Sequence, residues 1–176
     1  NNCAADPSFT AADIATSAEG AYSVFAADMD NDGDMDIVSA SYTDGDIAWY
    51  ENDGNTNPSW TAADIEDAFE GPVSVFVADI DNDGDMDIVS AFYGDDIIAI
   101  FINDGSADPS WNGNLAPITT GAANARSVFA ADLDNDGNMD IVSASSGDNT
   151  IAWYENTSTS GSITAWTASD IATSAD

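Results

Sequence analysis

The sequence predicts an all-β protein made of three repeated four-stranded units, preceded by one extra outer strand. Three observations support this prediction. An aspartate-rich stretch occurs three times, at residues 28–36, 79–87 and 132–140, with a period of about 50 residues. A Pro-Ser-aromatic tripeptide and a strand-like segment, IAWYEN in two of its three copies, repeat with the same period. Between them lie short segments rich in Val, Ile and aromatic residues, bounded by Gly, Asn and Asp, a pattern typical of strands and turns.

The first complete unit shows how the four strands follow one another. SVFAAD leads into the aspartate stretch and DIVSASY leaves it; a polar turn at Asp44 and Gly45 precedes IAWYEN, and WTAADI closes the unit. Four short antiparallel strands in a repeat of this length are typical of a β-propeller blade. The segments AWY and IAIFI are apolar on both faces, so we expect Trp49, Phe101 and Trp153 to lie in the core between blades.

The repeat divides the whole chain. Residues 21–70, 71–122 and 123–176 are expected to form the three blades. Residues 1–20 end in FTAADIATSAEG, which nearly matches the C-terminal WTASDIATSAD, and both resemble the outer strand WTAADI that begins at Trp60. This first segment is therefore predicted to be an extra outer strand, equivalent to the last strand of a blade.

The aspartate stretches have the spacing of a metal-binding loop. Carboxylates recur at loop positions one, three, five and nine, and glycine stands at position six, as in DMDNDGDMD of the first copy. A loop of oxygen ligands suits a hard cation, and a flexible site for six to eight ligands favours calcium over magnesium. An EF-hand is excluded because position twelve is Ser39, Ser90 or Ser143 rather than a bidentate Glu.

Because of their negative charge, the loops are expected to need a bound cation to stay folded. Two carboxylates about 4 Å apart repel by roughly 4 kcal/mol at an effective dielectric constant near 20. Each loop holds several such pairs, so we expect the loops to open without metal and the chain to bind about three calcium ions. Gly33, Gly84 and Gly137 stand where the chain folds back over the ion and needs a residue that tolerates positive φ and close backbone approach.

Together these motifs resemble those of a known family. The aspartate loop followed by DIVSA, IAWYENDG and Trp resembles the FG-GAP-like or VCBS repeat, which is found in bacterial extracellular proteins and is related to the calcium-loaded blades of integrin α-subunit propellers. The resemblance covers nearly the whole chain. It implies side-chain ligands at positions one, three, five and nine, with the carbonyl of position seven, where the third loop departs by carrying Asn. The implied metal-site residues are Asp28, Asp30, Asp32, Asp34, Asp36, Asp79, Asp81, Asp83, Asp85, Asp87, Asp132, Asp134, Asp136, Asn138 and Asp140.

Composition argues against several functions. The chain of 176 residues carries 33 acidic side chains, one cation, Arg126, and no histidine, for a formal net charge of -32. Such a surface repels nucleic acid and anionic membranes, so neither nucleic-acid binding nor membrane insertion is expected. Without histidine or lysine, and with the single cysteine, Cys3, near the terminus, the usual pairs of nucleophile and base cannot form. We therefore expect a protein that is not an enzyme.

The expected location is outside the cell, secreted or at the cell surface. Calcium sites of the weak extracellular class, with dissociation constants on the order of 0.1 to 1 mM, fill only where calcium is plentiful. Asn156 begins the sequon Asn-Thr-Ser and is a candidate for N-glycosylation. Cys3 cannot pair within its own chain, which leaves an interchain disulfide or a free thiol open.

Three blades cannot close a ring, because propellers need four to eight. Open blade faces and strand edges promote association. The sequence leaves open a filament, a closed homo-oligomer such as a ring of two chains, or an excerpt of a longer array. The predicted function is that of a calcium-stabilised extracellular structural or adhesive protein that self-assembles. The alternative is a calcium-dependent module that binds a glycan or an extracellular protein, with surface candidates Tyr42, Tyr93, Asp44, Asp95 and Asp148.

Overall fold

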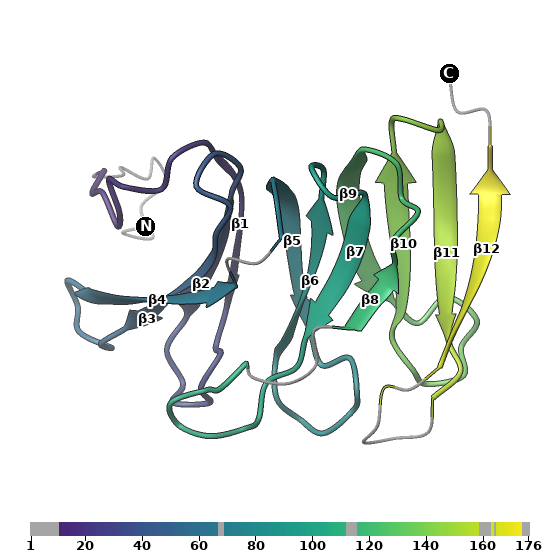
Figure 1. Cartoon of the computed structure of the whole chain (residues 1–176). Helices are drawn as coiled ribbons and strands as arrows, with labels where there is room; N and C mark the ends of the chain where they lie inside the picture. The colour runs from purple at the N-terminus through teal and green to yellow at the C-terminus, as the bar shows by residue number, and fades with distance from the viewer. Residues whose placement is uncertain (1–10, 67–68, 112–115, 159–162, 164, 174–176) are drawn as a thin grey trace, which may run out of the picture.

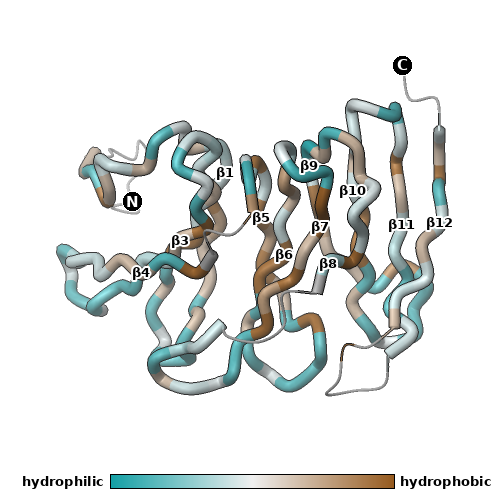
Figure 2. Tube along the Cα trace, viewed as in Figure 1, coloured by the Kyte–Doolittle hydropathy of each residue, from teal (hydrophilic) through white to brown (hydrophobic). Residues whose placement is uncertain are grey.

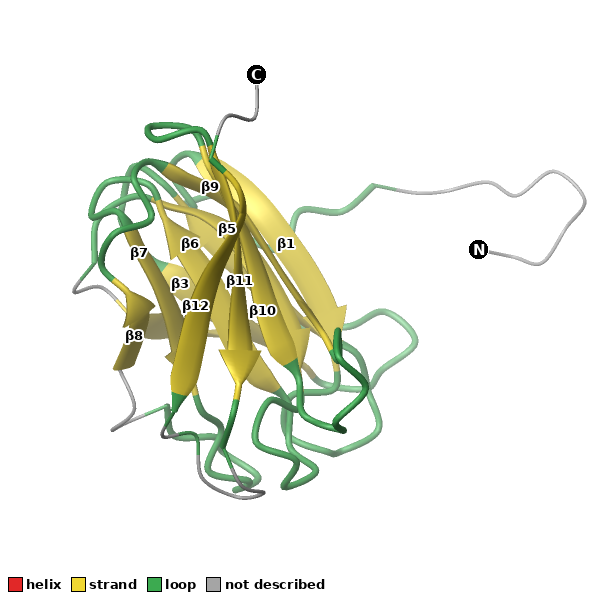
Figure 3. Ribbon diagram, turned by 90° about the vertical axis from the view of Figure 1, so that its right-hand side faces the viewer, coloured by secondary structure: helices red, strands yellow, loops and turns green. Residues whose placement is uncertain are grey.

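The chain folds into strands and loops. The structure, a computed structural model, describes residues 11–66, 69–111, 116–158, 163 and 165–173, and in this part it contains twelve strands and no helix (Figure 1, Figure 3). The strands form three four-stranded antiparallel sheets, which confirms the all-β, blade-like prediction. Within the same part of the chain there is no helix long and apolar enough to cross a membrane. Cys3 and the first half of the predicted extra strand lie outside the described residues.

Each sheet has its strands in chain order, and we call the three sheets the first, second and third blade. The first contains β1 (Ala21–Ala27), β2 (Asp36–Ser41), β3 (Ile47–Asn52) and β4 (Trp60–Glu66). The second contains β5 (Pro72–Ala78), β6 (Asp87–Phe92), β7 (Ile97–Phe101) and β8 (Ala116–Thr119). The third contains β9 (Ala125–Ala131), β10 (Asp140–Ser145), β11 (Thr150–Asn156) and β12 (Trp166–Ala172).

The blades stand side by side and do not close into a ring. In Figure 1 the first blade is at the left, the second in the middle and the third at the right. The first strands of successive blades, β1, β5 and β9, lie next to one another. Among the described residues, the first and third blades therefore each have one face that no other blade covers.

Two hydrophobic clusters form the core, one between each pair of neighbouring blades. The second blade contributes to both, so β6 and β7 are buried along their whole length and the middle of the molecule is the most hydrophobic part of Figure 2. Trp49 and Phe101 lie in the first cluster, as predicted. Trp153 is only half-buried, because its neighbours Ala152 and Tyr154 are the side chains of β11 that face the second blade.

The outer strands vary more than the inner ones. β4 and β12 have seven residues each and β8 has four. Pro117 lies in β8, where an edge strand tolerates the missing N–H. Residues 11–20 match β4 and β12 in sequence but form no strand. An outer strand must pair with the third strand of its own blade, and the described chain provides no blade before β1.

Because Phe92 is buried between the first and second blades, its substitution tests how much the packing between blades contributes to stability. Its ring is fully buried and lies 5.1 Å from the ring of Phe69 and 6.2 Å from that of Phe101, between ring centroids. We expect Phe92→Ala to lower the free energy of unfolding by about 3 to 5 kcal/mol, because it leaves a cavity. Phe129→Ala is the matched control: this ring is 55% exposed, and its loss should cost less than about 1.5 kcal/mol. Urea unfolding of dilute protein with calcium measures both, and equal losses would contradict the packing.

Candidate metal centre

The three aspartate loops occupy equivalent places in the three blades. Each joins the first strand of a blade to the second, from β1 to β2, from β5 to β6 and from β9 to β10. All three lie at the same edge of the molecule, at the bottom of Figure 1. Figure 2 shows that this edge is hydrophilic.

Hydrogen bonds from the backbone to the carboxylates shape each loop. In the first loop, Gly33 N donates to Asp28 Oδ2 at 3.0 Å, Asp32 N to Asp30 Oδ1 at 3.1 Å, and Asp34 N to Asp32 Oδ1 at 2.9 Å. The same three bonds measure 3.1, 3.2 and 2.9 Å in the second loop and 3.1, 3.0 and 2.8 Å in the third. The carboxylates at positions one, three and five therefore take part in one turn that is the same in all three blades.

The turn requires an unusual backbone conformation at position six. Gly33, Gly84 and Gly137 have φ angles of 97°, 101° and 94°, which side-chain-bearing residues rarely adopt. A Cβ at these positions would meet no atom within 4 Å. The predicted positive φ is confirmed, whereas the predicted close approach of the backbone is not found, so glycine is needed for its conformation rather than for space.

Each loop brings three carboxylates together. One oxygen of each carboxylate lies within 4.8 Å of the others in the groups Asp28, Asp30, Asp32; Asp79, Asp81, Asp87; and Asp132, Asp134, Asp136. The only cationic side chain of the sequence, Arg126, lies over the ring of Tyr93 instead. In the first loop, a buried oxygen, Asp28 Oδ1, has no hydrogen-bond partner. An unpartnered buried oxygen among like charges is what a hard cation such as calcium would satisfy.

The electrostatics of the clusters also favour a cation. Burial raises the pKa of Asp30 and of Asp81, and repulsion from neighbouring carboxylates adds to both shifts. Burial raises the pKa of Asp87 to about 7, although the N–H groups of Asn103 and Ile80 donate to it. Without a cation, these side chains therefore hold their charge less readily than they would in water. A bound divalent ion would supply the opposite charge.

The aspartate at position nine acts as a brace. Asp36 Oδ2 accepts a hydrogen bond from Met29 N at 3.0 Å, and its Oδ1 accepts one from Asn52 N at 2.9 Å. Asp87 and Asp140 each accept the equivalent two bonds. One oxygen of this carboxylate thus holds the loop, the other holds the end of the third strand or the residue just after it, and the side chain links the two segments. Of these three side chains, Asp87 is the one that also belongs to a carboxylate cluster.

The side chain at position seven points away from the cluster. The Asp34 carboxylate lies against Gly54, where a Cβ would collide with it, and Asp85 lies against Gly105 in the same way. Both glycines are in the connection that follows the third strand of the blade. This arrangement agrees with the implied role for the carbonyl of position seven rather than for its side chain.

The third loop differs from the other two. Asn138 stands at position seven, and its Nδ2 donates to Asp136 Oδ2 at 2.9 Å. Its three clustered carboxylates are all exposed, whereas those of the second loop are half-buried or buried. In the described part of the chain, the third blade follows the second loop, and no further blade follows the third loop.

An asparagine at the end of the third strand of a blade, or just after it, has a role that sequence reasoning missed. Asn103 is 2% exposed, and its Nδ2 donates to the Met29 carbonyl of the preceding blade at 2.7 Å. Asn156 Nδ2 donates in the same way to the Ile80 carbonyl at 3.3 Å. The signal was the recurrence of Asn at the end of IAWYEN and IAIFIN. Because a glycan would attach to this buried nitrogen, the Asn156 sequon could be modified only before the third blade forms.

The predicted surface candidates are partly used in internal contacts. The rings of Tyr42 and Tyr93 lie 6.0 Å apart between centroids, and Arg126 lies 4.3 Å above the Tyr93 ring. Backbone N–H groups donate to all three turn acids, Asp44, Asp95 and Asp148. These residues help to hold neighbouring segments together, and they line the surface at the edge opposite the loops.

Comparison with known families matches the FG-GAP-like repeat to residues 28–90, 79–143 and 132–176. Each match begins at the first aspartate of a loop, and together they run without a gap from residue 28 to residue 176. A comparison with curated proteins found no match. The first two matches therefore each span one aspartate loop, the remaining three strands of its blade, and the first strand and loop of the next blade.

The opposite orientations of Asp79 and Asp85 predict different effects on cation binding. Asp79 belongs to a carboxylate cluster, whereas the Asp85 side chain turns toward Gly105. We expect Asp79→Asn to weaken calcium binding at this loop by at least about tenfold, roughly 1.4 kcal/mol, because it removes a charged oxygen from the cluster. Asp85→Asn removes the same charge but should change the affinity by less than about threefold. Calorimetric titration with calcium measures both. Equal losses would mean that net charge alone decides binding.

Proposed function

The chain belongs to the FG-GAP-like repeat family, and from this premise we propose that it is a calcium-stabilised, extracellular structural or adhesive protein that assembles with copies of itself. Repeats of this family form adhesion-type and propeller-type modules. The joints of the proposed assembly are the open blade faces and the terminal strands. The observation that carries the proposal is the distribution of exposed apolar side chains.

Large exposed apolar side chains lie before or within the first blade and in the third blade, and one of them, Tyr42, borders the cleft between the first and second blades. Among the described residues they are Ile14, Tyr22, Val24, Met35, Tyr42, Phe129, Leu133 and Ile171. All of them precede the second blade or lie within the first or third, because neighbours cover the second blade on both faces. Exposed apolar faces next to unpaired strand edges favour association. A further copy of the chain is the simplest partner that covers them.

Calcium is proposed as the stabilising ion because of its energetic weight. At ten to a hundred times the dissociation constant, one site adds about 1.4 to 2.7 kcal/mol to the stability of the folded state. Three such sites would add about 4 to 8 kcal/mol, compared with about 5 to 15 kcal/mol for a whole domain. Bound calcium would therefore decide much of the folding equilibrium.

The proposed location outside the cell is supported by the family and by the chemistry of the loops. Repeats of this family are typical of extracellular and surface proteins. Exposed carboxylate clusters of the kind seen in the third loop suit weak sites, which fill only at the high calcium concentrations outside cells. Members of this family typically have structural or binding roles, and we propose no catalytic role for this chain.

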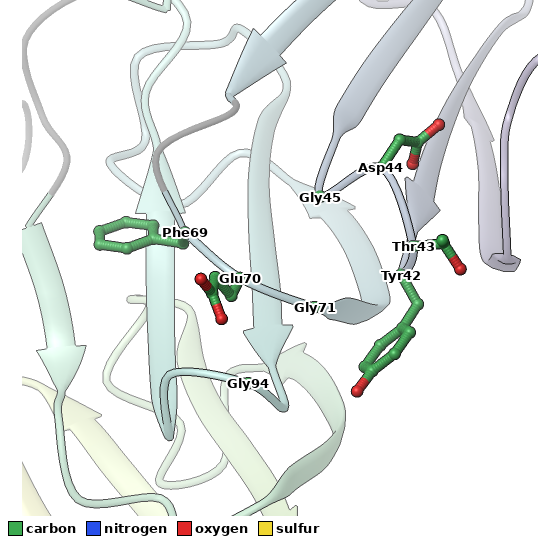
Figure 4. A pocket seen from close by; sticks show the side chains of 8 residues that line it. All are labelled: Tyr42, Thr43, Asp44, Gly45, Phe69, Glu70, Gly71 and Gly94. Atoms are coloured by element: carbon green, nitrogen blue, oxygen red, sulfur yellow. The ribbon is translucent and has the colours of Figure 1, made fainter.

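A second candidate function is calcium-dependent binding of a carbohydrate or a protein by a module of a longer protein. A cleft of about 430 Å³ lies between the first and second blades, lined by Tyr42, Asp44, Phe69 and Glu70 among others (Figure 4). A tyrosine ring beside two carboxylates offers stacking and hydrogen bonds to a sugar. A glycan array probed with calcium and again with chelator tests this function. Signals that disappear with chelator would favour it over self-assembly.

Removal of calcium tests the proposed stabilisation. We expect thermal melts in excess chelator to show a midpoint at least about 10 °C below that in millimolar calcium, because three sites together supply several kcal/mol. Circular dichroism at equal ionic strength measures the shift, and magnesium in place of calcium is the control. Melts that overlay with and without chelator would contradict the role of calcium.

Particle size tests the proposed self-assembly. We expect long or ring-shaped particles in calcium that fall apart when the ion is chelated, as judged by light scattering and electron microscopy. A single monomeric species under both conditions, at concentrations up to about 100 μM, would contradict self-assembly and favour a binding module.

A further inference from the structure

We infer that the joint between two copies repeats the contact between adjacent blades: the open face of one copy's third blade receives the open face of the next copy's first blade. The inference rests on the proposed self-assembly and gives it a surface, a partner and a direction. It follows from equivalent residues in the three blades. Two contacts between blades lie within the chain, and they serve as the pattern for a third contact between chains.

The residue at loop position two is a knob that enters the following blade. Met29 and Ile80 are both 0% exposed and lie in the clusters between their own blade and the next. Leu133 holds the same position in the third blade and is 46% exposed. Near it in β10, Val142 and Ala144 are only half-buried, although their counterparts in β2 and β6 are fully buried. The third blade thus presents a complete face for a following blade.

The first blade presents the face that such a knob needs. Val75 and Val128, near the middle of β5 and β9, are 5% and 6% exposed because they pack against the preceding blade. Val24 is their counterpart in β1 and is 68% exposed. Ile37 is half-buried, whereas its counterparts in β6 and β10 are fully buried. Residues 14–18 border the outer half of this face and leave the inner half, with Val24, open.

The hydrogen bonds between blades have donors and acceptors that would continue across the joint. Asn103, two residues after β7, and Asn156, the last residue of β11, each donate to the carbonyl of loop position two in the preceding blade. Asn52 ends β3 and donates to the Met35 carbonyl of its own loop at 3.0 Å. In the joint, its second Nδ2 hydrogen would reach the Leu133 carbonyl of the preceding copy.

A serine series along the innermost strands gives the same register. The backbone N–H groups of β5 and β9 donate across the contact to Ser23 Oγ and Ser74 Oγ, at 3.2 and 3.3 Å. Ser127 is the next member of this series and is exposed. In the joint, Ser127 Oγ would accept a hydrogen bond from the backbone N–H of Val24 in the next copy. The apolar residue at loop position two, the asparagine and the serine thus all specify the same alignment of the two blade faces.

The chain enters the first blade in the way that it enters a blade with a predecessor. Tyr42 N and Thr43 N donate to Gly20 O and Glu19 O at 2.9 and 3.1 Å. The same pair of bonds holds the linker into the second blade, and that linker comes from the outer strand of the first blade. The first blade is therefore built like a blade that follows another.

The two open faces differ, which gives the joint a direction. The apolar knob belongs to the third blade, and the asparagine donor belongs to the first. Contact between two third-blade faces would bring Leu133 against Leu133, and contact between two first-blade faces would leave the second Nδ2 hydrogen of Asn52 without an acceptor. The joint is therefore head to tail, and a filament or a ring of chains can satisfy it.

Both partners are strongly acidic, so salt should strengthen the joint. Each copy has a formal charge of -32, and like charges on two copies repel at long range. Screening shortens that repulsion to about 8 Å at physiological ionic strength. Assembly in calcium should therefore increase between low and moderate salt, unlike an assembly held by opposite charges.

Two variants that each block one face test the joint. Leu133→Asp blocks the third-blade face, and Val24→Asp blocks the first-blade face; both side chains are exposed in a single chain, so the fold should persist. Alone, each variant should stay monomeric at concentrations at least about a hundredfold above those at which the native chain assembles, because assembly would bury an unpaired charge. Mixed one to one, they should form a heterodimer and stop, since one intact face of each kind remains.

The mixture separates the possible outcomes, with calcium and moderate salt present throughout. Dimers formed by either variant alone would overturn the direction, because they require contact between like faces. Filaments or rings formed by either variant as readily as by the native chain would overturn the joint and leave the proposed self-assembly intact. A native chain that stays monomeric would overturn both the joint and the proposed self-assembly.

The control variant is Thr56→Asp, in an exposed loop after β3. It adds the same charge away from the two faces and should assemble normally. Unchanged thermal melts confirm that each variant folds.

Discussion

A buried carboxylate at the ninth position of each loop connects the parts of this protein that would otherwise be separate. Asp87 accepts N–H bonds from Ile80 in the loop and from Asn103 just after β7. The side chain of that same Asn103 then donates to a carbonyl of the preceding blade. One chain of hydrogen bonds therefore joins the aspartate loop, the segment after the third strand and the contact between blades. Loss of the carboxylate would leave two buried N–H groups without partners, each costing about 1 to 3 kcal/mol.

This network makes the loops and the blade contacts interdependent. A repeat protein is stabilised mainly by nearest neighbours, so each blade depends on its own packing and on the faces beside it. In the second blade both faces are covered and its loop cluster is partly buried; in the third blade one face is open and the cluster is exposed. A cation bound in a loop would also fix position two of that loop, which enters the following blade. A bound cation and a neighbouring blade would thus act on the same few residues.

Sequence reasoning succeeded where the determinants are local. Alternating apolar residues and the spacing of Asp and Gly predict the strands and the turn, because both depend on residues a few positions apart. It failed where a distant segment decides the outcome. The bracing role of Asp36 depends on Asn52 N, which lies in β3. The sequence of residues 11–20 matches an outer strand, yet a strand forms only where a third strand is present to pair with it. Trp153 is a large aromatic residue of the kind that usually lies in a core, but it faces the open side of the third blade, which no described blade covers.

The agreement between strand order and chain order has a consequence for how the protein folds. Every strand pairs with its neighbour in the chain, so each pairing closes a short loop and costs little chain entropy. All-β proteins usually fold slowly because their strands pair across long stretches of sequence, and this topology avoids that delay. A blade can be completed before the next one is available, beginning at the N-terminal end. A chain that emerges from a ribosome or a narrow channel can therefore fold progressively, one blade at a time.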